Sequence, residues 1–288
     1  YPMHYMGEGI WGAELKLNIA TELVYRYEVR YGDAVVRKEW GGKHTLLIDK
    51  KATNLRVLDS WHDMPADRSF HSSMFTDGVF ARPKRKKAQG AMDGYLTLRA
   101  DIASVRSTQS VVLVGDCKAL GNWSVEKGVV MNDAQAPIWS ARVKMPKSGF
   151  AYKFVIVDSE SGNVVAWQSG ENYYFNVATN TEEALVIEGL RPQFDMAPWR
   201  GAGVAIPVFS LRSKSSFGVG EFNDIRLMVD WAAQTGQSII QILPINDTTM
   251  TNTWQDSYPY NANSTFALHP QFIHLPAVGE LKDKEAMA

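Results

Sequence analysis

The chain has 288 residues, of which 45% are hydrophobic and 21% are charged, and its formal net charge is −1. This balance argues against binding to nucleic acid or to an anionic membrane through overall charge, whereas a neutral polymer fits it. Cys117 is the only cysteine, so no intrachain disulfide is possible, as is typical of a reducing compartment or of indifference to redox. No apolar run approaches the ~20 residues that span a bilayer.

Residues 1–62 are predicted to form the C-terminal part of a first all-β domain. Three of its segments recur in the same order later in the chain: WGAELKLN at 11–18, LVYRYEV at 23–29 and VVRKEWGGKH at 35–44. Their counterparts are WSARVKMP, FAYKFVI and VVAWQSGEN. Such a repeat indicates two copies of one module. The first copy lacks its opening strands, so we expect it to begin before Tyr1.

Residues 63–93 have little hydrophobic periodicity and are predicted to be a linker. Their basic run, RPKRKK at 82–87, has the composition of a nucleic-acid-binding or localisation segment. Because aromatic interleaving and a basic fold are both absent, we expect a solvated linker and no nucleic-acid partner.

Residues 94–192 are predicted to form a β-sandwich of immunoglobulin-like size, because about seven short alternating runs recur between turn signals within about a hundred residues. The runs lie at 96–102, 111–114, 139–145, 150–156, 164–168, 173–177 and 184–187. Trp123 and Trp167 lie beside turn residues, where side chains tend to face solvent. Trp139 lies on an alternating run, which leaves a core position equally open.

Residues 193–288 change in character. An apolar strand, GVAIPVFS from Gly203, leads into a glycine-containing loop and a helix whose apolar side chains recur from Phe222 to Ala232. Gly236 is expected to end the helix, and SIIQILP at 238–244 reads as a parallel strand covered on both faces. A strand, a helix and a strand in about 40 residues form a βαβ unit. This region therefore predicts the start of an α/β barrel of the TIM type, whose active sites lie in the loops after the strands.

Four stretches of the second β-domain resemble the family 20 carbohydrate-binding modules, the starch-binding domains: VVLVGDCKALGNWSVEKG, APIWSARVKMP, FAYKFVI and VVAWQSGENYYF. The resemblance implies that Trp123 and Trp167 stack on glucose rings, and that Lys153 and Asn172 hydrogen-bond sugar hydroxyls. It also places Trp139 in a second sugar site. The chemistry agrees, because a flat indole can cover the apolar face of a glucose ring, and an unpaired buried hydroxyl costs about 1–3 kcal/mol. The first copy differs at the equivalent positions, so we expect it to bind glucan differently, weakly or not at all.

Three motifs after the second domain, FGVGEF, QILPIND and SYPYNANSTFALHP, resemble the 4-α-glucanotransferases of glycoside hydrolase family 77, the amylomaltases or disproportionating enzymes. The cytosolic plant type carries two family 20 modules ahead of its barrel, and this order matches nearly the whole chain. The resemblance implies that Tyr260 and Ser257 contact the bound glucan. From the residues alone, SYPY also fits a proline-fixed aromatic turn. The resemblance further implies a cytoplasmic enzyme without a cofactor, whose partner is an α-1,4-glucan such as maltose, maltodextrin, starch, glycogen or a heteroglycan.

Enzymes of this family act by retention: one carboxylate forms a covalent glucosyl-enzyme, a second acts as acid and then base, and an acceptor sugar replaces water. The resemblance places both carboxylates on later barrel strands. We therefore expect no catalytic residue before Ala288, and we expect the 288-residue chain alone to be inactive. Glu221, Asp247 and Asp256 lie in suitable loops, but nothing in the sequence marks any of them as a nucleophile.

The six histidines show no metal-binding spacing such as HExxH, so no metal site is expected. Two other functions stay open: a non-catalytic α-glucan-binding protein, and an amylase-type hydrolase with the same modules. The products formed from maltose or longer dextrins would separate transfer from hydrolysis.

Overall fold

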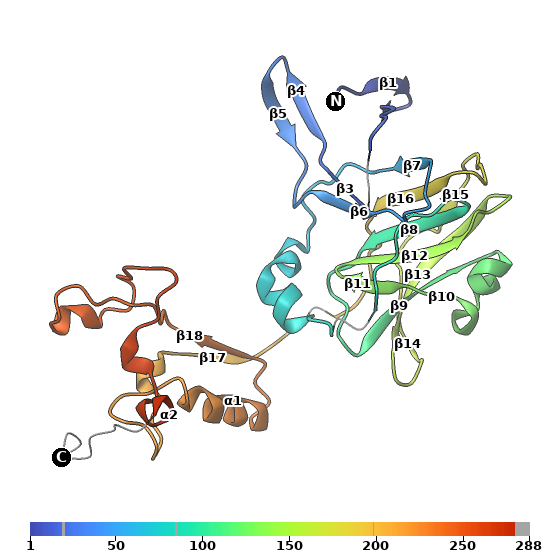
Figure 1. Cartoon of the computed structure of the whole chain (residues 1–288). Coiled ribbons are helices and arrows are strands. Elements are labelled where there is room, and N and C mark those ends of the chain that lie inside the picture. The colour runs from blue at the N-terminus through green and yellow to red at the C-terminus, as the bar shows by residue number, and fades with distance from the viewer. Residues whose placement is uncertain (19–20, 84–85, 198, 280–288) are drawn as a thin grey trace. The chain divides into compact units, whose positions relative to one another are not determined.

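The computed structural model describes residues 1–18, 21–83, 86–197 and 199–279. The chain divides into two compact units, Tyr1–Ala197 and Pro198–Ala288. The first unit is built mainly of β-strands, and the second carries a βαβ unit followed by long loops (Figure 1). The multidomain fold predicted from the sequence is confirmed at this level.

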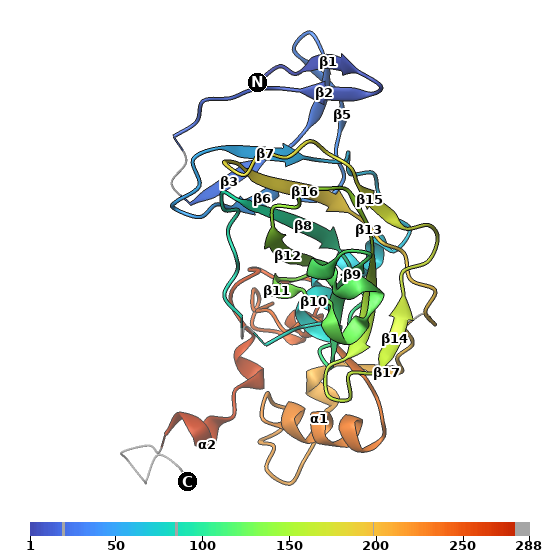
Figure 2. The same ribbon diagram turned by 90° about the vertical axis from the view of Figure 1, so that its right-hand side faces the viewer.

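A β-sandwich forms the centre of the first unit. One sheet has the order β10 (Val129–Val130), β9 (Gln109–Gly115), β13 (Phe150–Asp158) and β14 (Val164–Trp167), and β15 (Tyr173–Phe175) also pairs with β13. The other sheet has the order β11 (Asn132–Gln135), β12 (Ile138–Lys144), β8 (Tyr95–Asp101), β16 (Ala184–Leu190) and β7 (Leu55–Leu58) (Figure 2). Every strand predicted for the second domain is present, and the short β10 and β11 are additions to the prediction. The turn after β9 holds two 3₁₀ helices, η3 (Lys118–Trp123) and η4 (Val125–Lys127).

The sandwich core lies between these two sheets. Side chains point alternately to the two faces of a strand, so every second residue of each central strand enters the core. The large side chains that are almost completely buried there include Leu96, Leu98, Leu113, Trp139, Tyr152, Phe154, Phe175 and Leu185. Complete burial of one such side chain stabilises the fold by about 1.5–3 kcal/mol, which is why the alternating pattern identified these strands correctly.

The first copy of the repeat is only partly regular. It forms three two-stranded pairs: β1 (His4–Gly7) with β2 (Ile10–Gly12), β3 (Glu22–Tyr25) with β6 (His44–Leu47), and β4 (Glu28–Tyr31) with β5 (Ala34–Lys38). Of the repeated segment 11–18, only Trp11 and Gly12 lie in a strand, and the repeated segment 23–29 is interrupted between β3 and β4. A two-stranded pair without a packed face is only marginally stable, which explains why the alternation of 11–18 does not produce a longer strand.

Strand β7 of the first copy pairs with a strand of the second domain. It pairs in parallel with β16, with Val57 opposite Val186, and so extends the sheet of the sandwich. A small second core forms beside this pairing from Leu46, Ala91 and Val186, with Leu23 packed against it. The two copies therefore share a sheet, which the repeat pattern did not predict.

Residues 63–93, predicted to be a solvated linker, contain local structure and a few buried side chains in the part that the structure describes. The segment contains a 3₁₀ turn, η1 (Arg68–His71), and a π-helical turn, η2 (Met74–Val79). Phe70, Phe75 and Phe80 pack together with ring centroids 5.0–5.7 Å apart. In the basic run, the Arg82 side chain is only 10% exposed, whereas residues 84–85 lie outside the described residues.

In the second unit, β17 (Gly203–Ile206) and β18 (Ile239–Ile242) pair in parallel, and α1 (Asp224–Gln234) connects them (Figure 1). The predicted βαβ unit is confirmed, and Gly236, with φ 71°, follows the helix as predicted. Short helical turns η5 (Val208–Ser210), η6 (Trp254–Ser257) and η7 (Pro270–Phe272), and the helix α2 (Leu275–Val278), complete the unit. At Gly220, an added Cβ would lie 2.0 Å from two carbonyl oxygens, so the loop before α1 requires glycine there.

Candidate functional site

The outer face of the sheet β10-β9-β13-β14 carries an exposed indole and a lysine. On β13, Lys153 and Val155 alternate with core residues and therefore face outward. Val155 pairs with Trp167 of β14, and residues directly opposite each other in an antiparallel pair lie on the same face. The Trp167 side chain is 42% exposed. Trp123 is half-buried and packs on the same face, against the valine cluster that includes Val155.

Local backbone geometry fixes Trp123 in this position. Asn122 and Trp123 have φ values of 48° and 66°, in the left-handed region that few residues other than glycine adopt. Such conformations persist only where the surrounding structure determines them, and they gather at functional sites. At the preceding Gly121, a Cβ would lie 2.6 Å from the Lys127 carbonyl carbon, so the turn also needs a glycine.

Lys153 connects β13 to the turn after β14. Its Nζ donates to the carbonyl oxygens of Gln168, at 3.2 Å, and Gly170, at 2.7 Å. The ammonium group has three N–H donors, so one donor is left for a ligand. Asn172 follows this turn and is half-buried. Four of the five residues predicted to bind sugar thus lie on one sheet and on the two turns at its surface.

Trp139 has a different environment from the other two indoles. Its side chain is 1% exposed, and its Nε1 donates to the Ile102 carbonyl oxygen at 3.1 Å. The Arg82 guanidinium lies over the ring, 4.6 Å from the ring centroid, at the edge of a cavity of about 270 Å³. With its ring covered, Trp139 presents no open face to a sugar. Of the two alternatives that the sequence leaves open, the structure supports the core position.

The loop after β18 carries the two residues predicted to line a substrate cleft. Tyr260 is 60% exposed, and its ring lies 5.5 Å from that of Tyr258. Ser257 is exposed at the end of η6, where its Oγ donates to the Trp254 carbonyl oxygen at 2.7 Å. Both side chains are therefore accessible from solvent on the loop that follows a parallel strand, where barrel enzymes place their sites.

The carboxylates of this unit are occupied in holding their own loops. Glu221 is 2% exposed, accepts from the Phe217 backbone N–H, and pairs with His274 Nδ1 at 2.5 Å. Asp247 accepts from the Thr249 backbone N–H at 3.0 Å. Asp256 accepts from the backbone N–H and the hydroxyl of Thr251 and from the Asn252 backbone N–H. Each of the three therefore accepts at least one backbone hydrogen bond that stabilises its own loop.

Two regions of the chain match models of known families. Residues 96–187 match the family model for the starch binding domain, and residues 206–288 match that of the 4-alpha-glucanotransferases of glycoside hydrolase family 77. After these matches we call residues 96–187 the starch binding domain and residues 206–288 the family 77 region. Trp123, Lys153, Trp167 and Asn172 belong to the starch binding domain, and Tyr260 belongs to the glucanotransferase region.

The chain is also similar to individual proteins, over all or part of its length. The 4-alpha-glucanotransferase DPE2 of Oryza sativa subsp. japonica is 31% identical over 310 aligned residues, which cover 100% of this chain and 32% of the rice protein. The 4-alpha-glucanotransferase of Chlamydia trachomatis serovar D is 43% identical over 86 residues, 30% of this chain and 15% of its own length. The family 20 module of the maltotetraose-forming amylase from Pseudomonas saccharophila is 25% identical, with a TM-score of 0.28, over 33% of this chain and 99% of that module. The chain spans about a third of the length of the rice relative.

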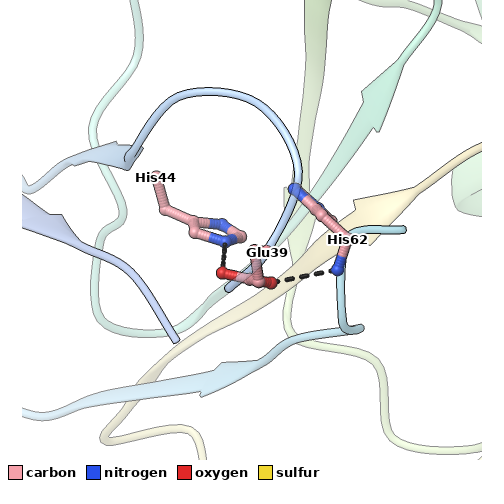
Figure 3. Close-up of side chains that lie close together, drawn as sticks. All are labelled: Glu39, His44 and His62. Atoms are coloured by element: carbon pink, nitrogen blue, oxygen red, sulfur yellow. Dashed lines mark hydrogen bonds and ion pairs between the residues drawn. The ribbon is translucent and has the colours of Figure 1, made fainter. Parts of the chain in front are cut away.

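Outside the two matched regions, the fold brings together Glu39, His44 and His62, whose ligand atoms lie within 4.8 Å of one another (Figure 3). Their spacing in the sequence gave no signal, because His62 lies beyond β7 whereas Glu39 and His44 lie before and at the start of β6. Glu39 Oε2 lies 3.0 Å from His44 Nε2 and also accepts from the Tyr27 backbone N–H, while Glu39 Oε1 accepts from that of His62. Burial by itself would raise the pKa of Glu39, but these hydrogen bonds outweigh it and hold the pKa below its ordinary value.

Both oxygens of Glu39 are thus used by hydrogen bonds that join the end of β5, the start of β6 and the segment after β7. The neighbouring cations also disfavour a divalent metal ion, because Arg99 and Arg191 lie beside the same histidines, on the wall of one cavity. The cluster fits a structural role: it holds three segments of the first copy together.

This role predicts a dependence of stability on pH. Burial, together with the charges of His44 and Arg191, lowers the pKa of His62 to about 4, against the opposing effect of Glu39. A histidine in the unfolded chain has a pKa near 6.5. As the pH falls from about 6.5 to about 4, His62 therefore becomes protonated in the unfolded chain but stays neutral in the folded protein. The free energy of unfolding therefore decreases across this window. Since part of the ring reaches solvent, we expect a loss of about 1–2 kcal/mol.

Urea unfolding of the protein and of His62→Gln at both ends of this window measures the effect. The wild-type protein should lose about 1–2 kcal/mol more than the variant on acidification. Burial raises the pKa of Glu188 to about 7 in the same network, but Glu188 is present in both proteins and its contribution largely cancels in the comparison. Equal pH slopes for the two proteins would contradict the burial of a neutral His62.

Within the part of the chain that the structure describes, no helix is both long and apolar enough to cross a bilayer.

Proposed function

We propose that the protein is a cytoplasmic 4-α-glucanotransferase of maltose and maltodextrin metabolism, which transfers α-1,4-glucosyl units from these donors to glucan acceptors. The observation that carries this proposal is the order of the two matched regions, a starch binding domain followed by a family 77 region, in a chain that aligns along its whole length with the rice glucanotransferase. The relatives' names supply the transfer reaction, and the exposed Trp167 and Tyr260 supply surfaces that fit a glucan.

In this proposal the starch binding domain holds the polymer while the barrel performs the transfer. The Trp123 and Trp167 rings lie on one face of the sheet, where two platforms set at an angle would favour the curved α-1,4 chain over a flat one. The remaining N–H of Lys153 and the amide of Asn172 would hydrogen-bond the sugar hydroxyls at the rim. Tyr260 and Ser257 would contact the glucan near the point of cleavage.

Retaining transfer needs two carboxyl groups about 5–5.5 Å apart, one as nucleophile and one as acid and base. Glu221, Asp247 and Asp256 hold their own loops and are not proposed for either role. The proposal therefore assigns binding residues to this chain and no catalytic residue.

A product assay on the longest polypeptide that the gene encodes tests the activity. With maltotriose as sole substrate, a transferase should release glucose and, in the same reaction, form dextrins longer than the substrate. Glucose and maltose without longer products would identify a hydrolase. An unchanged substrate, together with retained binding to starch, would leave a glucan-binding protein.

The binding role predicts that Trp167→Ala weakens association with soluble α-glucan. Losing a stacked indole should cost about 1–3 kcal/mol, which corresponds to a dissociation constant raised by about 5-fold to 150-fold. Isothermal titration with maltoheptaose or β-cyclodextrin would measure it. Val130→Ala is a suitable control, because Val130 is another exposed apolar side chain, 58% exposed, on the edge strand β10 of the same sheet. If the two variants bind the glucan with equal affinity, Trp167 is not part of the binding face.

A further inference from the structure

Tyr174 of β15 is a large aromatic residue that is 70% exposed. The residues on either side of it belong to the core. The ring of Tyr173 stacks on that of Tyr152, with the centroids 5.5 Å apart. The ring of Phe175 stacks on that of Phe150, at 5.1 Å. Successive side chains of a strand point to opposite faces, so Tyr174 points to the outer face of its sheet.

The same outer face carries Trp167. Val155 of β13 pairs with Trp167 of β14, and Ala151 of β13 pairs with Tyr174 of β15. Strand β9 pairs with the opposite edge of β13, so β14 and β15 follow one another along one edge (Figure 2). The four residues from Val155 to Ala151, at a rise of about 3.3 Å each, separate the two aromatic positions by about 13 Å along the strand. Lys153 faces outward halfway between them.

Hydrogen bonds fix the turn that joins the two aromatic positions. Gln168 is 5% exposed, and its side-chain oxygen accepts from the Phe154 backbone N–H at 3.3 Å. Its amide nitrogen donates to the Glu171 carbonyl oxygen at 2.9 Å. Lys153 Nζ donates to the carbonyl oxygens of Gln168 and Gly170. The backbone positions of the two aromatic residues are therefore set before a ligand binds, and little conformational entropy is lost on ordering the turn.

Polar groups lie between the two rings. The Lys153 ammonium group has one N–H left for a ligand, and Asn172 lies between the turn and β15. The core of a protein–protein interface is depleted in lysine, so this alternation of aromatic and charged groups does not suit an apolar protein surface. A glucan chain presents apolar ring faces and hydroxyl rims in turn, and it can cover both rings while its hydroxyls bond to the groups between them.

We propose that Tyr174 is a third aromatic platform of the glucan-binding face, in addition to Trp123 and Trp167. The site is then elongated and takes a segment of α-glucan longer than maltose. A maltose unit that stacks on Trp167 does not reach Tyr174, whereas a longer dextrin contacts both rings. The inference rests on the proposed glucan binding, which it extends to a preference for chain length, and it is independent of the transfer reaction.

Isothermal titration of the 288-residue protein with maltose and with maltoheptaose tests this inference. Trp167→Ala should raise the dissociation constants of both sugars. Tyr174→Ala should raise that of maltoheptaose by about fivefold to twentyfold and change that of maltose by less than about twofold. Equal weakening of both sugars by Tyr174→Ala would place the ring beside the same glucose units as Trp167 and refute the elongated site.

Two further outcomes separate this inference from the proposed function. If Tyr174→Ala binds maltoheptaose like the wild-type protein while Trp167→Ala binds it weakly, Tyr174 is not a platform and the proposed glucan binding stands. If neither substitution changes the affinity for maltoheptaose, the binding role of this face fails as well.

A series of dextrins from maltose to maltoheptaose gives a readout that a purely structural role of Tyr174 would not change. In the wild-type protein, affinity should increase with length until the chain spans both rings and then level off. In Tyr174→Ala the affinity should level off at a shorter dextrin. Parallel length profiles for the two proteins would overturn the proposal even if their affinities differ.

Matched variants distinguish the tyrosine ring from other causes. Tyr174→Thr removes the ring but keeps a β-branched residue that suits a strand, so it should bind like Tyr174→Ala. Tyr174→Phe keeps the ring and should bind maltoheptaose nearly as well as the wild-type protein. A loss in Tyr174→Phe as large as that in Tyr174→Ala would assign the contact to the hydroxyl and overturn the stacked ring.

Tyr31 provides a control outside this face. It is 85% exposed on β4, in the two-stranded sheet β4-β5 of the first copy. Tyr31→Ala should leave both dissociation constants unchanged, and the midpoint of urea unfolding shows that each variant is folded. If Tyr31→Ala weakens maltoheptaose binding as much as Tyr174→Ala does, the effect does not depend on the position of the ring and the proposal is wrong.

Discussion

Arg82→Ala should destabilise the first unit by about 3 kcal/mol, although Arg82 belongs to a basic run that reads as solvated. Its Nε donates to Asp133 Oδ2 at 2.8 Å, and its two terminal nitrogens donate to the carbonyl oxygens of Arg106 and Gln109, both at 2.7 Å. The Arg82 and Asp133 side chains are only 10% and 17% exposed. Removal of Arg82 leaves the poorly solvated charge of Asp133 unpaired and takes one donor from each of two carbonyl oxygens, which is the costly way to break such a pair.

Urea unfolding, followed by tryptophan fluorescence, would measure this loss. Lys86→Ala is the matched control: Lys86 approaches the same carboxylate, at 3.7 Å, but its side chain is 44% exposed, so we expect a change within about 0.5 kcal/mol. Burial by itself would raise the pKa of Asp133. The hydrogen bond from Arg82, together with the charges of Lys86 and Arg82, outweighs burial and keeps the pKa of Asp133 below its ordinary value. Similar small effects of both substitutions would show that the chain before the starch binding domain is not docked on it.

The strands of the starch binding domain could be predicted because each buries one face, and burial imposes a period of two on the sequence. Leu96, Leu98 and Ala100 of β8 record that period directly, and all three are completely buried. The same argument fails for residues 13–18, where apolar residues alternate but the described structure has no strand partner to cover them. Alternation indicates a strand only when a neighbouring strand satisfies the backbone.

Contacts between distant segments could not be predicted from one sequence. The parallel pairing of β7 with β16, and the cluster of Glu39, His44 and His62, depend on how the chain returns to the sheet after the first copy. No spacing rule records this, because the residues come from separate elements. The cavity beside this cluster could not be predicted for the same reason: its walls combine the repeat, the linker and the domain.

For the residues predicted to contact sugar, the turns were the part of the sequence that indicated exposure. Trp167 precedes a turn and is 42% exposed, while Trp139, on a regular strand, is 1% exposed. Both were candidates on family resemblance. The position of a tryptophan relative to strand and turn therefore separated an accessible ring from a covered one better than the residue type did.

Trp139→Ala should give the largest loss of stability in the starch binding domain, about 4 kcal/mol. The substitution opens a cavity between the two sheets, leaves the Ile102 carbonyl oxygen without its donor, and removes the ring that Arg82 covers. Trp139→Phe keeps most of the buried area and loses the hydrogen bond, so we expect an intermediate loss of about 1–2 kcal/mol.

Comparing Trp139→Ala with Trp167→Ala distinguishes a tryptophan of the core from one that binds glucan at the surface. A core tryptophan lowers the free energy of unfolding and affects glucan affinity only through unfolding, whereas a surface platform lowers affinity in a protein of normal stability. Because Arg82 and Trp139 are in contact, the double variant Arg82→Ala/Trp139→Ala should lose less than the sum of the two single losses. A Trp139→Ala variant of normal stability that has lost affinity for β-cyclodextrin would contradict the core position. The Trp139 ring would then be accessible in solution, and the Arg82 side chain would have to move away from it.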